Sequence, residues 1–567
     1  MAFGKREKYE DVKTLSITGV MNQEDFDNLC ELPFNADGIN LEGTYLEDVD
    51  VSPIAKLKHL SLAHLSETGI KGDLAVFNNL PMLQSLQLSG NKTIKGKLSD
   101  LNNLQFLSNL QLVGQDVLGN LADLKPNQEL VLVLLSDTPV TGSIADLTSL
   151  PNLRHLFLKN TQVSGSLSDL LSNNILVQID LSNTPVQGKL TDLANKSNLD
   201  LLYLADTQVS GNLKDLKSFA TDLKLLDLSN TLVEGDIASL VDIPLITDAN
   251  LENIQVYGDI GSIKNLSLIR SLNLNYTQVE GDIAQIANTV SLRELQLRET
   301  KAVGDVSSFS NLDSLNTIDI GSTQVAGDVS ALEGLLYLQV LYASNTSLGG
   351  NLASLSAANN LMLLDASRTN IVGDIASLKD LPNIYVIALK ETGVYGDLAS
   401  LKNLVLLRQL DLSKTHIYGN AAELLKLVDL VSLDLSEVNI VMPARTLDAF
   451  PHTAEVPFKD HTSATIAPQN LKGGSYNPAQ GTVTWNVPAS ATDTLSYSFA
   501  TTVSIGQTTG TYSGSLVQPL APSSNKALAP TGDSHAGLLI APLILSALLM
   551  AALAIRNRHK EAIKRVR

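Results

Sequence analysis

Apolar residues recur along this chain in a repeated unit of about 23 residues, which runs from about residue 48 to residue 419. One clear copy, IRSLNLNYTQVEGDIAQI, begins at Ile269, and its apolar positions stay in register with a glycine. The glycines of sixteen copies are Gly72, Gly96, Gly119, Gly142, Gly165, Gly188, Gly211, Gly235, Gly258, Gly281, Gly304, Gly327, Gly350, Gly373, Gly396 and Gly419. The step between successive glycines is constant, except that it is one residue longer from Gly72 to Gly96 and from Gly211 to Gly235. A period of this length indicates a solenoid, in which each unit stacks on its neighbours.

Within one copy, the apolar spacing predicts a strand, a turn and a convex segment. Leu272 and Leu274 are two residues apart, which is the period of a strand. Gly281 supplies backbone freedom where the chain must bend, and Ile283 and Ile286 return apolar side chains to the core. A single copy cannot bury these residues, so stacked copies should share one core. We therefore expect an α/β-type solenoid, with a parallel β-sheet on its concave face and short helical, 3-10 or irregular segments on its convex face.

The pattern LxxLxLxxTxVxGDIxxL resembles the leucine-rich repeat family, and its glycine resembles the plant-type subclass of that family. The ninth position is usually Asn in the family, but it is Thr in thirteen of the sixteen copies, from Thr68 to Thr415. Lys92, Gln115 and Ile254 interrupt this column. Because a hydroxyl can both donate and accept a hydrogen bond, we predict a threonine ladder between stacked turns, in place of an asparagine ladder.

Two columns of acidic residues run along the copies and replace one another. The first lies four residues after the glycine, at Asp100, Asp123, Asp146, Asp169, Asp192 and Asp215. The second directly follows the glycine, at Asp73, Asp236, Asp259, Asp282, Asp305, Asp328, Asp374 and Asp397. We interpret the first column as helix N-caps, because serine, another N-cap residue, mostly replaces it from Gly235 onward. Capping does not obviously require the second column, so we expect a solvated edge there, with a bridging divalent cation as the alternative.

Residues that face outward from the predicted strands form the candidate ligand surface. From these and adjacent outward sites we select His155, Phe157, Tyr203, Tyr276, Arg298, Tyr342 and Arg368. Aromatic residues and arginines among polar neighbours favour protein binding, since such side chains often dominate the energy of an interface. We expect Tyr203, Tyr276 and Tyr342 to lie on one face, three copies apart. The alternative is a solvated sheet face without a partner.

Composition divides the chain into an array and its flanks. Residues 1–47 contain degenerate copies that should cap the leucine-rich repeat array of residues 48–443. Residues 444–518 alternate in period 2 around Trp485, the only tryptophan, and predict a small all-β sandwich of Ig-like type. The position of this segment resembles that of the domain behind the repeats of internalin-like bacterial surface proteins, although internalin repeats are one residue shorter and lack this glycine. Residues 519–533 read as a linker that ends in a short motif.

The C-terminal residues have the order of a cell-wall sorting signal. The motif LAPTG comprises Leu528, Ala529, Pro530, Thr531 and Gly532. It precedes a hydrophobic segment at 534–555, whose uncharged run 536–555 is long enough to span a bilayer, and a basic tail at 556–567. This order resembles the LPxTG-type signals of Gram-positive bacteria, although Ala529 replaces the usual proline. The resemblance implies cleavage between Thr531 and Gly532 by a sortase, and attachment of Thr531 to peptidoglycan. A simple single-span anchor is the alternative.

Charge and missing motifs exclude several classes of function. The net charge of −19 argues against nucleic-acid binding, since phosphate contacts need clustered Lys and Arg. A single cysteine, Cys30, excludes an intramolecular disulfide framework and CxxC motifs. The sequence contains no HExxH, Walker A or GxSxG motif, so we expect no enzyme, no cofactor and no metal site. Residues 1–10 contain no apolar signal-peptide core, and we expect a truncated start.

These observations together predict a binding protein of the cell surface. The chain should act as an adhesin-like protein, anchored to the Gram-positive cell wall, that presents its repeat face to a protein or glycan of a host or neighbouring cell. Two other functions stay open at this point: a structural spacer without a ligand, and a single-span, receptor-like membrane protein.

Overall fold

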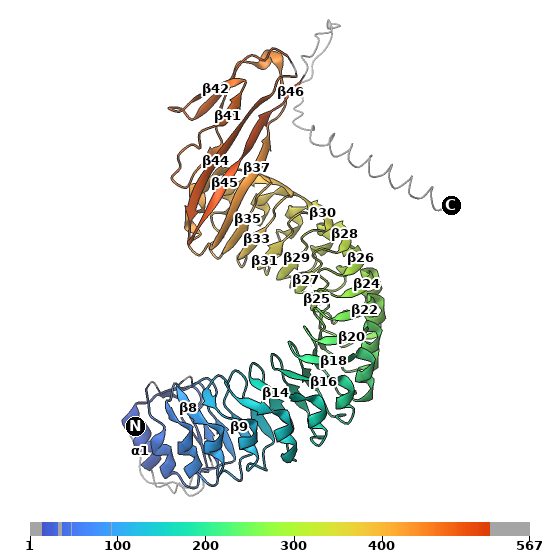
Figure 1. Ribbon diagram of the computed structural model, residues 1–567. Coiled ribbons are helices and arrows are strands. Elements are labelled where there is room, and N and C mark those ends of the chain that lie inside the picture. Colours follow the sequence, from blue (N-terminus) through green and yellow to red (C-terminus); the bar gives the residue numbers. More distant parts are fainter. Residues whose placement is uncertain (1–13, 32–36, 47, 92, 491, 522–567) are drawn as a thin grey trace, which may run out of the picture.

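The described part of the chain forms a curved solenoid that ends in a long β-hairpin (Figure 1). This computed structural model describes residues 14–31, 37–46, 48–91, 93–490 and 492–521. The sorting motif, the hydrophobic segment and the basic tail lie outside the described residues. Within the described ranges, no helix is both long enough and apolar enough to span a membrane.

The main sheet is parallel along the whole solenoid, with one strand from each copy. Its strands are β1 (Thr14–Ser16), β3 (Gly38–Asn40), β5 (Leu62–His64), β7 (Ser85–Gln87), β9 (Asn109–Gln111), β11 (Leu132–Leu134), β13 (His155–Phe157), β15 (Gln178–Asp180), β17 (Leu201–Tyr203), β19 (Leu225–Asp227), β21 (Asp248–Asn250), β23 (Ser271–Asn273), β25 (Glu294–Gln296), β27 (Thr317–Asp319), β29 (Val340–Tyr342), β31 (Leu363–Asp365), β33 (Val386–Ala388), β35 (Gln409–Asp411) and β37 (Ser432–Val441). Leu272 of β23 pairs in register with Leu295 of β25, so the leucines stack from copy to copy. The predicted parallel sheet and solenoid are confirmed.

The segment around each repeat glycine forms a second parallel sheet that the sequence analysis treated only as a turn. Its strands are β12 (Thr141–Ser143), β14 (Gln162–Ser166), β16 (Val186–Lys189), β18 (Gln208–Asn212), β20 (Leu232–Asp236), β22 (Gln255–Asp259), β24 (Gln278–Asp282), β26 (Lys301–Asp305), β28 (Gln324–Asp328), β30 (Ser347–Asn351), β32 (Asn370–Asp374), β34 (Gly393–Asp397), β36 (His416–Asn420) and β40 (Phe458–Lys459). A three-stranded sheet of β6 (Gly72–Asp73), β8 (Ile94–Lys97) and β10 (Asp116–Leu118) precedes it. Each turn of the solenoid is thus hydrogen-bonded to the next at two places.

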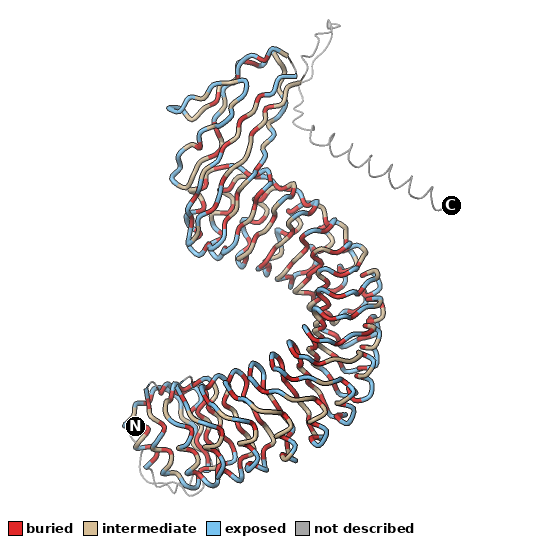
Figure 2. The backbone as a smooth tube through the Cα atoms, viewed as in Figure 1, coloured by how far each residue is buried: buried red, intermediate tan, exposed pale blue. Residues whose placement is uncertain are grey.

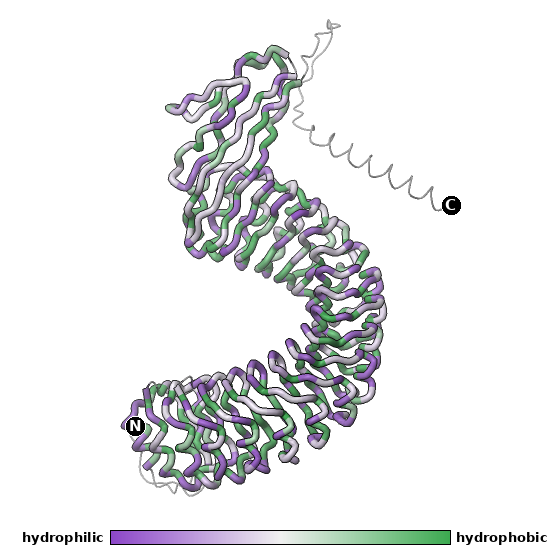
Figure 3. Tube along the Cα trace, in the orientation of Figure 1, coloured by the Kyte–Doolittle hydropathy of each residue, from purple (hydrophilic) through white to green (hydrophobic). Residues whose placement is uncertain are grey.

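Short 3-10 helices close each coil on the side away from the main sheet (Figure 1). In the copy of β23 the helix covers Ile283–Ile286, and both isoleucines are fully buried together with Leu272 and Val279. Buried and exposed residues therefore alternate around every coil, and apolar residues follow the buried positions (Figures 2 and 3). The core is one continuous column along the solenoid axis, as expected for units that cannot be stable alone.

The repeat glycine is required for two reasons. Gly281 has φ +106°, a conformation that side chains with a Cβ rarely adopt. A Cβ on this glycine would also collide with Asp259 Oδ1 of the preceding turn. Gly258 and Gly304 show the same two features. These copies therefore require glycine at this position, because successive turns approach one another closely.

Both acidic columns cap the convex helices, which agrees with the capping role predicted for the first column and shows that the second column caps as well. Asp282, directly after the glycine, accepts a hydrogen bond from the Ala284 amide at 2.8 Å and is the N-cap of its helix. Asp100, four residues after the glycine, instead accepts from the amide of the cap residue Lys97, at 2.7 Å. Lysine cannot accept a hydrogen bond, so in that copy the carboxylate comes from the third helical residue. In these copies a single carboxylate accepts the capping hydrogen bond, either from the position directly after the glycine or from the position four residues after it. This explains why an aspartate in one column replaces an aspartate in the other.

The predicted threonine ladder is wrong. Thr277 Oγ1 donates to the carbonyl of Leu274 in its own turn, at 2.7 Å, and the other threonines of the column repeat this bond to the residue three positions earlier. Backbone amides supply most of the bonds between turns, and Thr68 is the threonine whose hydroxyl also contacts the next turn, at Asn91 Oδ1, 3.2 Å away. Asn91, one position before Lys92, is the exception, because its longer amide donates to the carbonyls of Leu65 and Leu88.

Helix α1 (Gln23–Glu31) covers the N-terminal end of the solenoid core. Its buried side chains are Phe26, Leu29 and Cys30, and the degenerate copies add strands β1 and β3 to the main sheet. Burial raises the pKa of the Cys30 thiol to about 12, so this cysteine acts as a core residue.

At the other end, the β-hairpin continues the main sheet. Strand β45 (Thr508–Gln518) pairs with β37 in parallel, β44 (Leu495–Ile505) pairs with β45 antiparallel, and β41 (Gln469–Lys472) adds to β44. A three-stranded sheet of β39 (His452–Glu455), β43 (Thr482–Trp485) and β42 (Gly474–Asn477) lies beside it.

Aromatic side chains join these strands to the end of the solenoid. Phe458 stacks on Phe499 with ring centroids 3.8 Å apart, and Trp485 stacks on Tyr497 at 6.0 Å. Because β37 begins before residue 444 and belongs to the sheet of both parts, the C-terminal strands are continuous with the repeats. The Ig-like class of this region stays a prediction.

Candidate functional site

The concave surface of the main sheet presents two outward residues from each short strand. In β29, Leu341 is fully buried, whereas Val340 and Tyr342 on either side of it are half-buried. The same alternation places His155 and Phe157 of β13 on this surface, and Tyr203 of β17. Arg298 lies two residues beyond β25, and its guanidinium turns back over the ring of Tyr342. We call this surface the concave face.

Tyr276 and Arg368 lie in the turns that follow β23 and β31, whereas Tyr203 and Tyr342 lie on strands. Both residues have a left-handed backbone, with φ +60° for Tyr276 and +56° for Arg368. The chain reverses direction there, so the two-residue alternation of the strand does not continue. Arg368 forms an ion pair with Glu391 of the next turn, 3.4 Å away.

Aliphatic side chains surround the two remaining tyrosines. Val340 pairs with Leu363 in the row beside Tyr342, and Val386 extends this row by one strand. The row beside Tyr203 pairs Leu201 with Leu225. Tyrosines next to aliphatic residues on a rigid sheet can bury large contact areas with little loss of side-chain entropy. The concave face therefore has two separate apolar patches, centred on Tyr203 and Tyr342.

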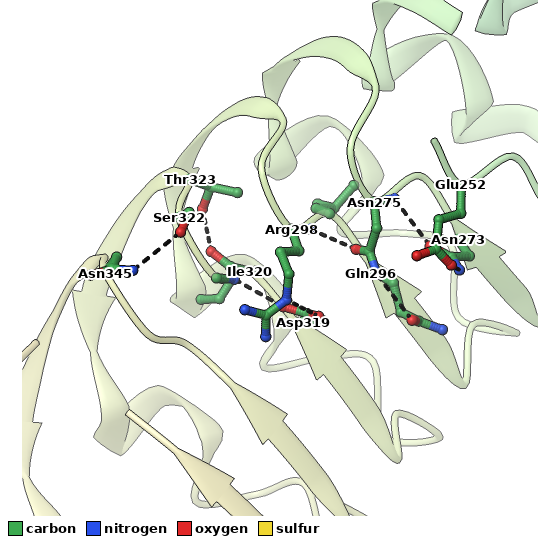
Figure 4. A network of polar contacts seen from close by, with 12 residues as sticks. Glu252, Asn273, Asn275, Gln296, Arg298, Asp319, Ile320, Ser322, Thr323 and Asn345 are labelled. Carbon is green, nitrogen blue, oxygen red and sulfur yellow. Dashed lines mark hydrogen bonds and ion pairs between the residues drawn. The ribbon is translucent and has the colours of Figure 1, made fainter. Parts of the chain in front are cut away.

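A polar network connects the middle of the concave face to the Tyr342 patch (Figure 4). It starts at Glu252, which accepts from Asn273 Nδ2 at 2.9 Å, and continues through Asn275, whose Oδ1 accepts from the Arg298 amide at 2.7 Å. Arg298 Nε donates to Asp319 Oδ2 at 2.9 Å, and the guanidinium carbon lies 5.0 Å from the ring centroid of Tyr342. The arginine is therefore held by a carboxylate and an aromatic ring at once.

Glycine at position 321 makes this arrangement possible. A Cβ at Gly321 would lie 2.9 Å from Arg298 Nη1, which is closer than such atoms pack. Asp319 also accepts from the Gly321 amide at 3.0 Å, so both oxygens of the buried carboxylate have partners. Burial raises the pKa of Asp319, although the hydrogen bond from Gly321 and the charge of Arg298 both oppose this shift.

Comparison with known proteins agrees with the solenoid fold described above. The family described as LRR adjacent matches residues 464–521. Three similar solved structures are receptors or parts of receptors. The ectodomain of GASSHO1/SCHENGEN3 from Arabidopsis thaliana, in complex with CASPARIAN STRIP INTEGRITY FACTOR 2, has 20% identity and a TM-score of 0.55 over 72% of this chain and 54% of that one.

The other two structures cover more of their own chains. A TDR receptor has 19% identity and a TM-score of 0.58 over 75% of this chain and 76% of that one. The HAESA ectodomain from Arabidopsis, in complex with an N-terminally extended IDA peptide hormone, has 20% identity and a TM-score of 0.54 over 76% of this chain and 82% of that one.

The fold is a leucine-rich-repeat solenoid. The repeat period predicted a solenoid, and the resemblance of the repeat pattern to the leucine-rich repeat family predicted its type. This leucine-rich-repeat chain spans only about half the length of the first of these receptors, 54%, and the similarity in each case concerns the fold.

The leucine-rich-repeat coils also carry a side-chain ladder that the sequence analysis missed. Asn183 Nδ2 donates to Asn160 Oδ1 at 2.8 Å, and Asn160 Nδ2 donates to Asp137 Oδ1 at 2.6 Å. Asn253 donates to Asn230 of the preceding copy in the same way. These residues occupy the left-handed position just before the threonine column, in which Ile254 follows Asn253, and asparagine and aspartate tolerate that conformation well. Frequent Asn and Asp at this position were the available signal.

A cavity of about 320 Å³ lies where the last coil meets the C-terminal strands. It is lined mainly by apolar side chains, among them Tyr418, Met442, Val483, Trp485 and Tyr497. Within the described part of the chain, no group of three or more His, Cys, Asp or Glu side chains is placed to hold a metal ion. The groups that could contact a ligand on the concave face are therefore aromatic, aliphatic and charged side chains.

Proposed function

We propose that the concave face binds a protein or peptide ligand outside the cell. The observation that carries this proposal is the Tyr342 patch, where Val340 and Leu363 flank a half-buried aromatic ring beside a fixed arginine. Such a patch combines apolar contact area with a pre-organised polar rim, which is the anatomy of a binding hot spot. The GASSHO1/SCHENGEN3 and HAESA structures contain bound ligands, which supports the same use of this fold here.

Binding to whatever partner a protein and glycan array identifies should depend on the two tyrosine patches. Changing Tyr203 and Tyr342 together to Ser should weaken binding at least tenfold, measured by surface plasmon resonance, because each change removes a contact area that aromatic hot spots provide. The melting temperature should stay nearly unchanged, since both rings lie outside the core.

Tyr257→Ser is the matched control, because Tyr257 is 51% exposed on β22 of the second sheet. Full binding by the double variant would contradict the proposed site. It would favour the other class of function considered above, a structural spacer without a ligand.

We further propose an adhesin-like role on the Gram-positive cell wall, anchored by a sortase. This proposal rests on the order LAPTG, hydrophobic segment and basic tail in the sequence. Expressed behind a working signal peptide in a sortase-bearing host, the protein should resist extraction by detergent and be released by a muralytic enzyme. Thr531→Ala should move it to the detergent-extractable membrane fraction. Complete extraction of the wild type by detergent would instead indicate a single-span anchor.

A further inference from the structure

The two tyrosine patches are built from the same arrangement of residues. Asp180, Tyr203 and Asp227 occupy the third position of three successive strands, and their Cα atoms are paired in register. Six strands further along the sheet, Asp319, Tyr342 and Asp365 repeat this order. We call these two sets the first and the second triplet. In each triplet the tyrosine lies between two aspartates on the concave face.

The local environments of the two triplets agree in further details. Asp180 and Asp319 are both buried, 8% and 4% exposed, and each accepts a backbone amide two residues later at 3.0 Å. Asp227 and Asp365 accept the equivalent amides at 3.0 and 3.1 Å. These bonds orient all four carboxylates, so both triplets present fixed negative charge beside an aromatic ring.

The second triplet already contains a cation from the chain itself. Arg298 donates to Asp319, as Figure 4 shows. Its guanidinium carbon also lies 5.0 Å from the ring centroid of Tyr342. The molecule therefore shows which chemical group this arrangement holds, namely a guanidinium between a carboxylate and a tyrosine ring.

Among the described residues, the first triplet has no such internal cation. The position equivalent to Arg298 is Lys159, which is exposed and affects Asp180 only through its charge. The position equivalent to Gly321 is Ser182. Because a Cβ at Gly321 would lie 2.9 Å from Arg298 Nη1, we infer that the Cβ of Ser182 leaves no room for a guanidinium held in the same way. A cation of a partner would approach Tyr203 from the solvent on the concave face and would not need the space beside Ser182. The ring of Tyr203 and the second carboxylate oxygen of Asp227 are therefore available, among the described residues, to contact a side chain of a partner.

We propose that the first triplet, Asp180–Tyr203–Asp227, binds an arginine or lysine side chain of the partner. This inference rests on the proposed function and adds the chemistry of the ligand. Charge on the concave face agrees with it, because Asp248 lies on the next strand and, together with the two triplet aspartates, makes the surroundings of Tyr203 negative. The partner is accordingly a protein or peptide segment with a basic residue flanked by aliphatic ones, which would contact Leu225.

The test uses acetyl-Leu-Arg-Leu-amide and its citrulline analogue as probes of the full chain. Citrulline keeps the shape of arginine and removes its charge. Ligand-observed NMR titration should give at least fivefold weaker binding for the citrulline peptide. Tyr203→Ser and Asp227→Asn should each weaken binding of the arginine peptide to a similar degree. Asp365→Asn is the matched control and should change it less than twofold, since Arg298 occupies that triplet.

Two engineered variants test the comparison between the triplets directly. Lys159→Arg combined with Ser182→Gly should build an internal arginine over Tyr203 and lower the affinity for the arginine peptide at least fivefold. Arg298→Met should open the second triplet and raise the number of peptides bound from one to two. Circular dichroism verifies that each variant is folded.

Equal binding of the arginine and citrulline peptides, or no measurable binding of either, would overturn this inference. Arginine-peptide binding that survives both Tyr203→Ser and Asp227→Asn would also overturn it. These outcomes are distinct from failure of the proposed function, which is decided by binding of the array-identified partner to the variant with both tyrosines changed. If the partner no longer binds the variant with both tyrosines changed but still binds Asp227→Asn, the concave face remains the binding surface. The proposed cation site at the first triplet would then be wrong.

Discussion

Replacing Gly281 with alanine should destabilise the central coils by about 1.5–5 kcal/mol. Alanine at φ +106° is strained, at a cost of about 1–3 kcal/mol. Its Cβ would also displace Asp259, whose carboxylate caps the preceding helix by accepting from the Gly261 amide, and a lost cap costs about 0.5–2 kcal/mol. Because neighbouring coils stabilise one another, the damage should appear first in the copies on either side. Hydrogen exchange of residues 255–305, measured by mass spectrometry, should become faster.

Gly334→Ala provides the matched control for this prediction. Gly334 is exposed, has no atom of the described chain within 4 Å of the place a Cβ would take, and does not have a positive φ. This change should alter the exchange of neighbouring amides very little. Unchanged exchange in Gly281→Ala would show that the turns can separate without loss of stability, contrary to the close approach seen at the glycine column.

Replacing Lys196 with leucine should stabilise its coil by about 1–3 kcal/mol at pH 7, with the gain disappearing above about pH 10.5. Lys196 is fully buried, its ammonium donates to Asn195 Oδ1 at 2.8 Å, and burial lowers its pKa from 10.5 to about 8. One unit of pKa corresponds to about 1.4 kcal/mol, so the upper end of this range is close to the full shift.

The direction of the pH dependence follows from the lowered pKa. Between pH 8 and 10.5 the unfolded chain binds more protons at this lysine than the folded chain, so wild-type stability rises with pH across that window. Below pH 8 the cost of the buried charge is fully present, and above pH 10.5 it is absent. The difference between variant and wild type, rather than either value alone, isolates Lys196 from the other groups that titrate at high pH.

Equivalent positions in other copies show that leucine fits there. Leu150, Leu266 and Leu312 are buried at the same place in their coils. Lys214→Leu is the control, since Lys214 is exposed and its replacement should give no pH-dependent gain. Hydrogen exchange of residues 186–213 at pH 7 and, after correction for intrinsic rates, at about pH 10.5 measures both variants. A gain of equal size at both pH values would show that packing, and not the buried charge, is responsible.

The amino-acid sequence was sufficient for the parts of this fold that depend on one short, repeated pattern. A constant repeat period with leucines two apart permits only a stack of parallel strands, because no single copy can bury its own apolar face. The same pattern identified His155, Phe157, Tyr203 and Tyr342 as concave-face residues, since the alternation within a strand does not depend on what surrounds it. The glycine column also indicated a turn correctly, although not the second sheet that runs through it.

Contacts between coils could not be derived from one repeat unit. Tyr276 lies in a turn and not on a strand because the backbone turns left-handed after β23, and this depends on the path to the next element. Thr277 bonds to a carbonyl of its own turn. The two acidic columns share the capping of the helices according to which residue precedes each helix.

The pairing of Arg298 with Asp319 joins side chains 21 positions apart, and the C-terminal hairpin adds to β37 from much further along the chain. Glu437 of β37, for example, donates its amide to Ser513 of β45, which lies 76 positions later. Such contacts depend on side-chain reach and strand register in three dimensions. Local propensity carries no information about either, because both arise only when separate segments of the chain are brought side by side.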